Sequence, residues 1–223
     1  MRWEPIRASS PSAMTSAPRR ETAIAVFAKA PVAGTVKTRL AAVLGADAAA
    51  SLHAGLVRHA IATAVQARTG PVQLRCLPDT SHPFFERCRD ESGVALEPQH
   101  GADLGARMRD AFESVAGPLI VIGADCPVLT ADHLRGAAAT LETKDAVLVP
   151  AEDGGYVLLG LARAVPQVFE GVAWGTAAVM TQTRERLAAA RAAWTEMPTL
   201  WDVDRPEDYA RLQREGLLGE VLS

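Results

Sequence analysis

A short basic segment follows the first apolar run of the chain and carries residue types that bind phosphate. Lys29, Lys37 and Arg39 surround a single glycine, Gly34. A loop that enters a helix presents free backbone N–H groups and the positive end of the helix dipole, which favours anions. The spacing fits neither the GxxxxGKS/T nor the GxGxxG pattern. We therefore interpret the segment as a phosphate site of another kind, with a solvated basic turn as the alternative.

Three further stretches place carboxylates where the chain changes direction. Asp125 comes directly after the apolar run 118–123, where it could bind a divalent cation that bridges phosphates, or cap the next turn. Asp204 lies at the entrance of a predicted helix, which starts well whether or not this carboxylate is also a ligand. Residues 152–156 (EDGGY) combine two acids with two glycines, so a ligand can approach the backbone closely. An ordinary hairpin turn is the alternative there.

Other polar candidates have simpler explanations. Residues 99–108 (QHGADLGARM) have the pattern of a capped helix start, with Arg107 opposite the apolar stripe. The five histidines show no HxxxH or HExxH spacing, which argues against a zinc site. Cys126 has no histidine in an evident partnering position, so we interpret it as a small packed thiol rather than a nucleophile.

Alternating apolar runs and helical patterns must position these residues. Continuous apolar runs predict strands over 23–28, 71–77, 94–97, 118–123, 145–150 and 156–161. Apolar residues at helical spacing predict helices over 46–67, 84–91, 176–191 and 206–215, and two more that Asp103 and Thr130 cap. The pattern already turns helical at Val36.

This order of elements predicts the α/β class, as a Rossmann-like three-layer sandwich with a mostly parallel central sheet and helices on both faces. In such sheets, ligands bind beyond the carboxyl ends of the strands. The loops 29–39, 125–127 and 152–156 all follow predicted strands, which directs attention to them as the site. No linker or internal repeat divides residues 21–223, so we expect one domain.

Composition narrows the classes of function. The 223 residues are 48% hydrophobic, which suffices for a buried core, and no apolar run approaches the ~20 residues of a membrane span. A net charge of −3 and an aromatic content of 5% argue against nucleic acid as a partner. Three cysteines without a CxxC motif favour reduced thiols and a cytoplasmic location. Residues 1–20 lack the apolar stretch of a secretory signal and are expected to be a disordered tail.

The motifs, taken in order, are those of a known family. They are FAKAP (27–31), GTVKTRL (34–40), DLGARM (103–108), IGADCP (122–127), PAEDGGY (150–156), FEG (169–171) with Trp174, and DVD (202–204). On these motifs, residues 23–212 resemble the bacterial glycosyltransferase-like family often labelled radical-SAM/selenodomain-associated transferase. That family lies within the GT-A superfamily of nucleotide-diphospho-sugar transferases.

The resemblance implies a GT-A fold that binds a nucleotide and a divalent cation, Mg²⁺ or Mn²⁺. Asp125 and Asp204 would bind the metal, although Gly123 stands where a full DxD motif has its first Asp. The nucleotide and its phosphates would contact Lys29, Gly34, Lys37, Arg39, Gly105 and Arg107. The acceptor side would consist of Glu152, Asp153, Gly154, Gly155 and Tyr156.

The resemblance leaves three functions open. The first is a metal-dependent glycosyltransferase with a nucleotide-diphospho-sugar donor and a small-molecule acceptor. In that reaction Lys37 and Arg39 would neutralise the leaving diphosphate, and Asp153 is the candidate base for an acceptor hydroxyl. The alternative is a nucleotidyltransferase that passes NMP from an NTP to a phosphorylated small molecule. The third is a nucleotide-sensing module without turnover.

Overall fold

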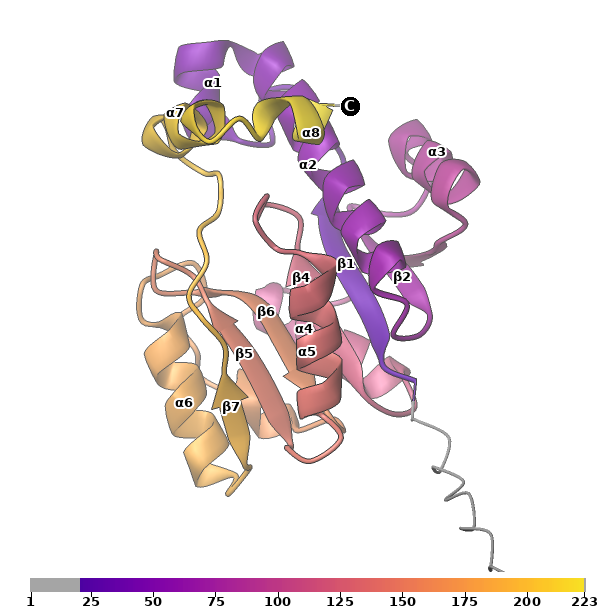
Figure 1. Ribbon diagram of the computed structural model, residues 1–223, viewed down its shortest axis with the longest axis vertical. Helices are drawn as coiled ribbons and strands as arrows, with labels where there is room; N and C mark the ends of the chain where they lie inside the picture. The colour runs from indigo at the N-terminus through magenta and orange to yellow at the C-terminus, as the bar shows by residue number, and fades with distance from the viewer. Residues whose placement is uncertain (1–20, 223) are drawn as a thin grey trace, which may run out of the picture.

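A seven-stranded sheet forms the centre of the protein (Figure 1). The computed structural model describes residues 21–222, so the tail predicted for residues 1–20 lies outside the described residues. The strand order is β3-β2-β1-β4-β6-β5-β7. The strands are β1 (Ala23–Lys29), β2 (Val72–Leu77), β3 (Ala95–Pro98), β4 (Leu119–Gly123), β5 (Ala146–Pro150), β6 (Tyr156–Leu161) and β7 (Trp194–Glu196).

Most neighbouring strands run parallel. β1 pairs in parallel with β2 and β4, β2 with β3, and β5 with β7, whereas β6 is antiparallel to both β4 and β5. The exception has a simple cause, because the short connection from β5 to β6 cannot make the crossover that a parallel pair requires. The predicted mostly parallel sheet is therefore confirmed. The carboxyl ends of β1, β2 and β4 open at one edge of the sheet.

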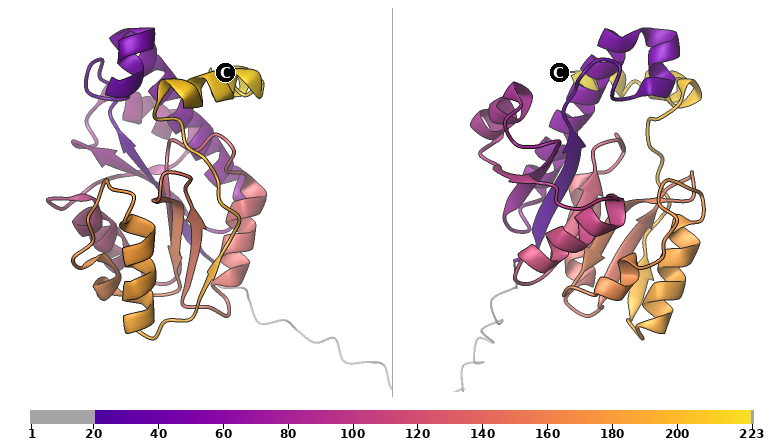
Figure 2. Two further views of the ribbon diagram at one scale, coloured as in Figure 1. Left: turned by 90° about the vertical axis from the view of Figure 1, so that its left-hand side faces the viewer. Right: turned by 180° about the vertical axis from the view of Figure 1, so that it is seen from behind.

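Helices cover both faces of the sheet, as predicted (Figures 1 and 2). On one face lie α2 (Ala46–Ala67), α3 (Pro83–Ser92) and α5 (Ala131–Thr140). On the other lie α4 (Leu104–Ser114), the 3-10 helix η1 (Pro166–Phe169) and α6 (Val179–Ala189). The predicted caps are present, since the side chains of Asp103 and Thr130 accept hydrogen bonds from the first turns of α4 and α5.

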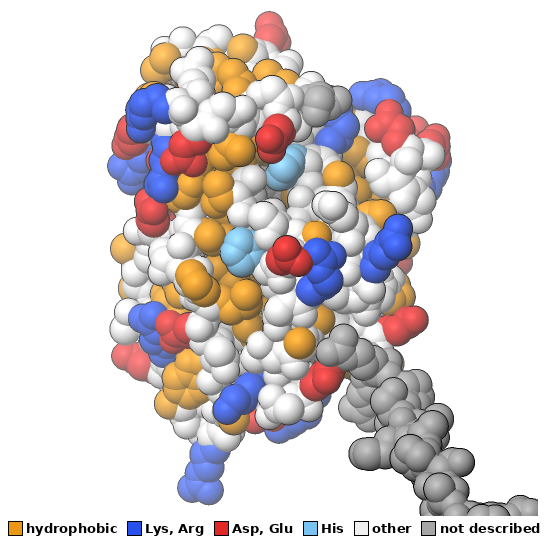
Figure 3. Space-filling model, in the orientation of Figure 1, with side chains coloured by type: hydrophobic (Ala, Val, Ile, Leu, Met, Phe, Trp, Pro, Cys, Tyr) orange, Lys and Arg blue, Asp and Glu red, His pale blue; other side chains and the backbone are white. Residues whose placement is uncertain are grey.

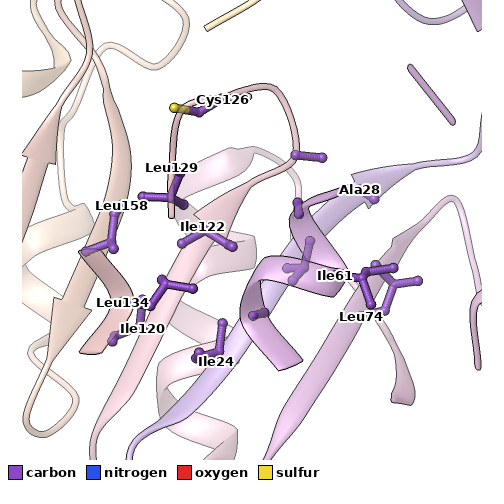
Figure 4. Close-up of a cluster of buried hydrophobic side chains, with 14 of the residues drawn as sticks. Ile24, Ala28, Ile61, Leu74, Ile120, Ile122, Cys126, Leu129, Leu134 and Leu158 are labelled. Atoms are coloured by element: carbon purple, nitrogen blue, oxygen red, sulfur yellow. The ribbon is translucent and has the colours of Figure 1, made fainter. Parts of the chain in front are cut away.

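Successive side chains of a strand point to opposite faces of the sheet and pack into the two helical layers in turn. Ile24 and Val26 pack in the layer of α2, α3 and α5, whereas Ala23 and Ala25 pack in the layer of α4 and α6. Figure 4 shows the first layer, where Ile120 and residues of the helices meet side chains of β1. Full burial of an isoleucine or leucine side chain, such as that of Ile120, stabilises the fold by about 2 kcal/mol.

A third apolar cluster joins distant parts of the chain beyond the carboxyl end of β1. It contains residues of α1 (Thr38–Leu44), α2, α7 (Pro206–Arg214), α8 (Leu218–Leu222) and the segment before α7. Its members are Leu40, Ala49, Leu52, Leu56, Trp201, Val203, Leu212 and Val221. In Figure 1 the yellow segment runs from β7 to α7, next to α1. This packing brings residues 202–204 to the carboxyl edge of the sheet.

Some element boundaries differ from the predictions. The helix predicted from Thr176 begins at Val179, because the Thr176 hydroxyl donates to the Ala173 carbonyl (2.8 Å) and accepts from the Ala178 N–H (3.3 Å) in a local turn. Gly45, with a φ of 83°, separates α1 from α2. The three-residue β7 and the five-residue α8 were not predicted, since segments this short show no periodicity.

The molecular surface carries mixed charge. On the face drawn in Figure 3, basic and acidic side chains lie next to one another with apolar atoms between them. That face shows no continuous basic stripe of the kind that binds nucleic-acid backbones. Within residues 21–222, no helix combines the length and the apolarity that crossing a membrane requires.

Candidate active site

A cavity of about 570 Å³ opens at the carboxyl ends of β1 and β4, beside the loop that leads into α1. Its charged lining consists of residues that the sequence analysis assigned to phosphate or metal binding: Lys29, Lys37, Arg39, Arg107, Asp125 and Asp204. They come from the end of β1, the start of α1, α4, the loop after β4 and the segment before α7. The fold therefore brings four cations and two carboxylates to one cavity.

Lys37 is buried at the base of this cavity. Its side chain is 4% exposed, and its Nζ lies 2.7 Å from Asp125 Oδ1 and donates to the Val203 carbonyl oxygen at 2.6 Å. Its backbone is left-handed (φ 47°, ψ 41°), a conformation that costs a residue with a Cβ of order 1 kcal/mol. The two contacts fix the ammonium in one place. Lys37 thus ties the first loop to both acidic segments.

Asp125 presents one oxygen to the protein and the rest of its carboxylate to the cavity. Oδ1 is buried, yet the side chain is 42% exposed, so the exposure falls on its other atoms. Burial alone would raise the pKa of Asp125, but the Lys37 ammonium and the neighbouring His53 ring outweigh it and hold the pKa well below its usual range. Asp125 is therefore ionised at neutral pH.

His53 was not predicted as a site residue. Its side chain is 7% exposed, with Nε2 3.0 Å from the Lys29 carbonyl oxygen and Nδ1 3.8 Å from Asp125 Oδ1. Because a carbonyl oxygen only accepts, Nε2 carries a hydrogen. In the sequence His53 lies beside the buried stripe of α2, where a histidine resembles any other core residue, so no signal pointed to it.

Arg39 and Asp204 form a second ion pair at the mouth of the cavity. The Arg39 side chain is 63% exposed and that of Asp204 is 42% exposed. Exposed pairs of this kind contribute at most about 1 kcal/mol to stability, so a ligand can open the pair at small cost. The backbone of Asp204 is firmly held, since its N–H donates to Asp208 Oδ2 (3.1 Å) at the entrance of α7.

A second hollow of about 320 Å³ adjoins the first and shares Arg39, Leu104 and Asp204 with it. It contains three residues of the predicted acceptor side, Asp153, Gly155 and Tyr156, together with Trp174 and Asp202. The carboxylate of Asp153 is exposed and accepts a hydrogen bond from the Gly155 N–H (2.9 Å). The charged residues that line the second hollow are one cation, Arg39, and three carboxylates, Asp153, Asp202 and Asp204.

Glu152, Gly154 and Tyr156 of the predicted acceptor side make mainly internal contacts. Glu152 pairs with Arg211 of α7 at 3.1 Å. Gly154 has a φ of 92°, and a Cβ there would lie 2.5 Å from the Ala177 carbonyl oxygen, so the turn requires glycine. Burial raises the pKa of Tyr156, and its hydroxyl donates to Met108 Sδ at 3.6 Å.

Asp202, like His53, was not predicted as a site residue. Burial raises its pKa to about 6, and the charges of Asp153 and Asp125 add to the effect while Lys37 opposes it. The sequence showed it only as a neighbour of Asp204 in the DVD motif. The shift therefore arises first from burial, and the two neighbouring acids only add to it.

Two predicted phosphate-binding glycines do not line the cavity. Gly34 has a φ of 79° in the loop before α1, where it provides the turn. Gly105 lies under Trp174, and a Cβ there would come within 2.3 Å of Trp174 Nε1. Gly105 therefore allows the tryptophan ring to pack on the first turn of α4, which forms one wall of the second hollow.

The cysteines take no part in the site chemistry. Cys76, Cys88 and Cys126 are free and buried. Burial raises the pKa of the Cys126 thiol to about 12, so it carries almost no thiolate at neutral pH. The interpretation of Cys126 as a packed thiol is confirmed.

Residues 60–176, more than half of the chain, match the family model described as "uncharacterized protein conserved in bacteria (DUF2064)". The chain belongs to the DUF2064 family. No curated protein matches its sequence significantly.

Solved structures similar to this DUF2064 protein are transferases or share their fold. A protein of Desulfovibrio desulfuricans G20, provisionally assigned as a nucleotide-diphospho-sugar transferase, has 29% identity and a TM-score of 0.76 over 90% of this chain and 98% of its own. A nucleotidyl transferase from Methanothermobacter thermautotroptrophicus has 12% identity and a TM-score of 0.61 over 90% and 100%. Rv0371c of Mycobacterium tuberculosis H37Rv, solved with manganese, has 17% identity and a TM-score of 0.54 over 86% and 98%. The predicted GT-A-like fold is confirmed.

The carboxylates of the DUF2064 protein suit a cation that is bound jointly with a substrate. Among residues 21–222, no group of three or more His, Cys, Asp or Glu side chains could hold a metal ion by itself. Asp125 and Asp204 nevertheless line one cavity, and both are partly exposed toward it. Mg²⁺ typically binds through one or two carboxylates and completes its coordination with water and substrate phosphates. The donor set fits such an ion.

Proposed function

We propose that this protein is a metal-dependent glycosyltransferase that uses a nucleotide-diphospho-sugar donor and a small-molecule acceptor. The observation that carries the proposal is the cavity at the carboxyl ends of β1 and β4, with four cations and two carboxylates in its lining. Its volume of about 570 Å³ lies in the range of ligand sites. The similarity to the D. desulfuricans protein supports the same assignment.

The cations account for the donor side of the reaction. Cleavage of a sugar–diphosphate bond develops negative charge on the leaving diphosphate, and fixed positive groups stabilise that charge. Arg39 and Arg107 present guanidinium groups to the cavity, and Lys29 and Lys37 add two ammonium groups. Arg39 can leave its exposed pair with Asp204 to bind phosphate, whereas Lys37 acts from its buried position.

Asp125 and Asp204 would hold the divalent cation. Bound there, Mg²⁺ or Mn²⁺ would neutralise the diphosphate as a Lewis acid. The manganese in Rv0371c supports a metal of this class on the shared fold. Gly34 and Gly105 would contribute indirectly, through the turn before α1 and the packing of Trp174.

The second hollow would bind the acceptor. Asp153 is exposed there, and its carboxylate can take the proton of an acceptor hydroxyl if the transfer inverts the sugar carbon. The three buried, free thiols support a reducing compartment, the cytoplasm, as its location.

The charge of the second hollow favours glycosyl over nucleotidyl transfer. The alternative, a nucleotidyltransferase that passes NMP to a phosphorylated small molecule, must bind a phosphorylated acceptor. With Asp204 assigned to the metal and Arg39 to the donor diphosphate, the second hollow keeps the carboxylates of Asp153 and Asp202, which would repel that phosphate. A neutral or cationic acceptor meets no such repulsion. The proposed acceptor is therefore an uncharged or basic small molecule.

The proposal is tested by identifying the product released from the donor. With nucleotide-diphospho-sugars, Mg²⁺ or Mn²⁺, and a panel of neutral and basic acceptors, we expect metal-dependent release of a nucleoside diphosphate. Asp204→Asn should lower the rate about 100-fold, the order expected when one charge-stabilising group is lost. Asp132→Asn, on α5, is the matched control, because this side chain is 88% exposed and lines neither hollow. Release of pyrophosphate from an NTP, without turnover of any nucleotide sugar, would support the nucleotidyltransferase instead.

A further inference from the structure

Gln99 lines the cavity but belongs to none of the assigned groups. It follows β3, and its backbone N–H continues the ladder by donating to the Cys76 carbonyl oxygen of β2 at 3.0 Å. Its side-chain Nε2 donates to the Ala28 carbonyl oxygen (3.1 Å) and to the Arg75 carbonyl oxygen (2.7 Å). The amide is therefore clamped across the ends of β1 and β2.

The clamp fixes which end of the amide is free. Both N–H groups of Nε2 are used by carbonyl oxygens, which only accept. A flipped amide would place Oε1 against two carbonyl oxygens, so the observed orientation is the one that chemistry allows. Among residues 21–222, no protein group donates to Oε1, and Oε1 is not among the buried polar atoms without partners. Gln99 therefore offers the cavity one hydrogen-bond acceptor.

This acceptor marks the part of the cavity that cannot bind phosphate. An amide oxygen and a phosphate oxygen both accept and repel one another, whereas three of the four cations, Lys37, Arg39 and Arg107, belong to the start of α1 and to α4. Apolar side chains at the ends of β1 and β2, Phe27 and Leu77, line the cavity as well. An acceptor beside apolar surface suits the edge and the face of a nucleobase.

We infer that Gln99 reads the nucleobase of the donor and selects bases that carry an exocyclic amino group. This inference rests on the proposed function, since it concerns the nucleotide of the same site. A free glutamine amide can pair with any base edge by offering one donor and one acceptor. In Gln99 both side-chain N–H groups already donate to the carbonyl oxygens of Ala28 and Arg75. The amine of cytosine or adenine can donate to the remaining oxygen.

Uracil and hypoxanthine are disfavoured by the same geometry. Uracil has one N–H between two carbonyl oxygens, so a lone acceptor that reaches this N–H also approaches two like partial charges. Hypoxanthine has a carbonyl where adenine has its amine. A neutral hydrogen bond contributes about 1 kcal/mol, so the expected preference for the amino-bearing base is about fivefold to tenfold.

Matched pairs of nucleotides test this directly. Dissociation constants for CDP against UDP, and for ADP against IDP, are measured with Mg²⁺ by calorimetry on the full chain. In at least one pair the amino-bearing base should bind about fivefold to tenfold more tightly. Gln99→Met, which keeps the length of the side chain without its polar atoms, should bring that ratio to about one. Gln66→Met, on the exposed face of α2, should leave it unchanged.

The possible outcomes separate this inference from the proposed function. If none of the four nucleotides binds, the proposed function fails and the inference with it. If nucleotides bind but the dissociation constants within both pairs are about equal, only the inference fails. The same holds if the preference for the amino-bearing base is unchanged in Gln99→Met. A merely structural role for Gln99 would weaken all four nucleotides equally and leave the ratio intact. If Gln99→Met does not fold, the wild-type ratios still decide.

Discussion

The cavity contains two ion pairs between a cation and an aspartate, and they differ in burial and in what they contribute. Lys37 and Asp125 meet where Lys37 is 4% exposed, and the ammonium also binds the main chain of Val203. Arg39 and Asp204 meet where their side chains are 63% and 42% exposed. The first pair holds the architecture together, because the Lys37 ammonium and Asp125 Oδ1 are both buried and neither of these atoms can find water if the other leaves. The exposed pair can exchange its partners for a ligand.

Removal of the buried cation should have the largest effect. Lys37→Met leaves Asp125 Oδ1 and the Val203 carbonyl oxygen without their donor, so the free energy of unfolding should fall by about 3 kcal/mol. Urea denaturation measures the change. Lys29→Met, at an exposed position, is the control and should change the free energy by less than about 0.5 kcal/mol. Equal effects of the two variants would refute the distinction.

Removal of both buried charges should recover part of that loss. In Lys37→Met/Asp125→Asn no carboxylate is left unpaired, so the double variant should be about 1 kcal/mol more stable than the sum of the single changes predicts. A double-mutant cycle by urea denaturation gives the coupling. Additive changes would mean that the two side chains do not depend on one another.

Acid should act on the buried pair through Asp125. Its pKa is lowered in the folded protein, so its contribution to stability is present above the unfolded pKa and is lost as the pH falls through the folded value. The wild-type free energy of unfolding should therefore begin to fall below about pH 5 and continue to fall below about pH 3, and less steeply in Asp125→Asn. Unfolding curves at several pH values measure both slopes, and identical slopes would contradict the expectation.

The exposed pair should matter least for stability. Arg39→Met should change the free energy of unfolding by at most about 1 kcal/mol, because water replaces the guanidinium around Asp204. The same change should lower the affinity for a nucleoside diphosphate, measured by calorimetry. A variant that is destabilised as strongly as Lys37→Met would show that both pairs are structural.

The sequence predicted those parts of the site that follow long apolar strands. The run before Asp125 and the run before Lys29 are continuous and apolar, as in buried parallel strands, so the carboxyl ends of β4 and β1 could be expected at the same edge of the sheet from the pattern alone. The location of Asp204 was available only through its motif. Its approach to Arg39 depends on Trp201 and Val203 packing against α1 and α2, which no local pattern encodes.

The lack of a local pattern also explains why His53 and Gln99 were not predicted as site residues. His53 lies on a helix whose pattern is that of a core helix, and its position next to Asp125 depends on how α2 lies on the sheet. Gln99 falls just beyond a four-residue strand, and its role follows from two carbonyl groups on other strands. Contacts between main chain and side chains across strands leave no trace in the composition of either segment.

The two hydrogen bonds of Val203 have a consequence for biosynthesis. Its N–H donates to the Asp125 carbonyl oxygen (2.8 Å), and its own carbonyl accepts from Lys37. Residue 203 leaves the ribosome after every strand of the sheet has been made. A nascent chain can thus assemble its sheet while the buried ammonium of Lys37 still lacks this partner and Asp204 is still absent from the cavity. Synthesis of the segment before α7 is therefore the step that converts a folded sheet into a complete binding site.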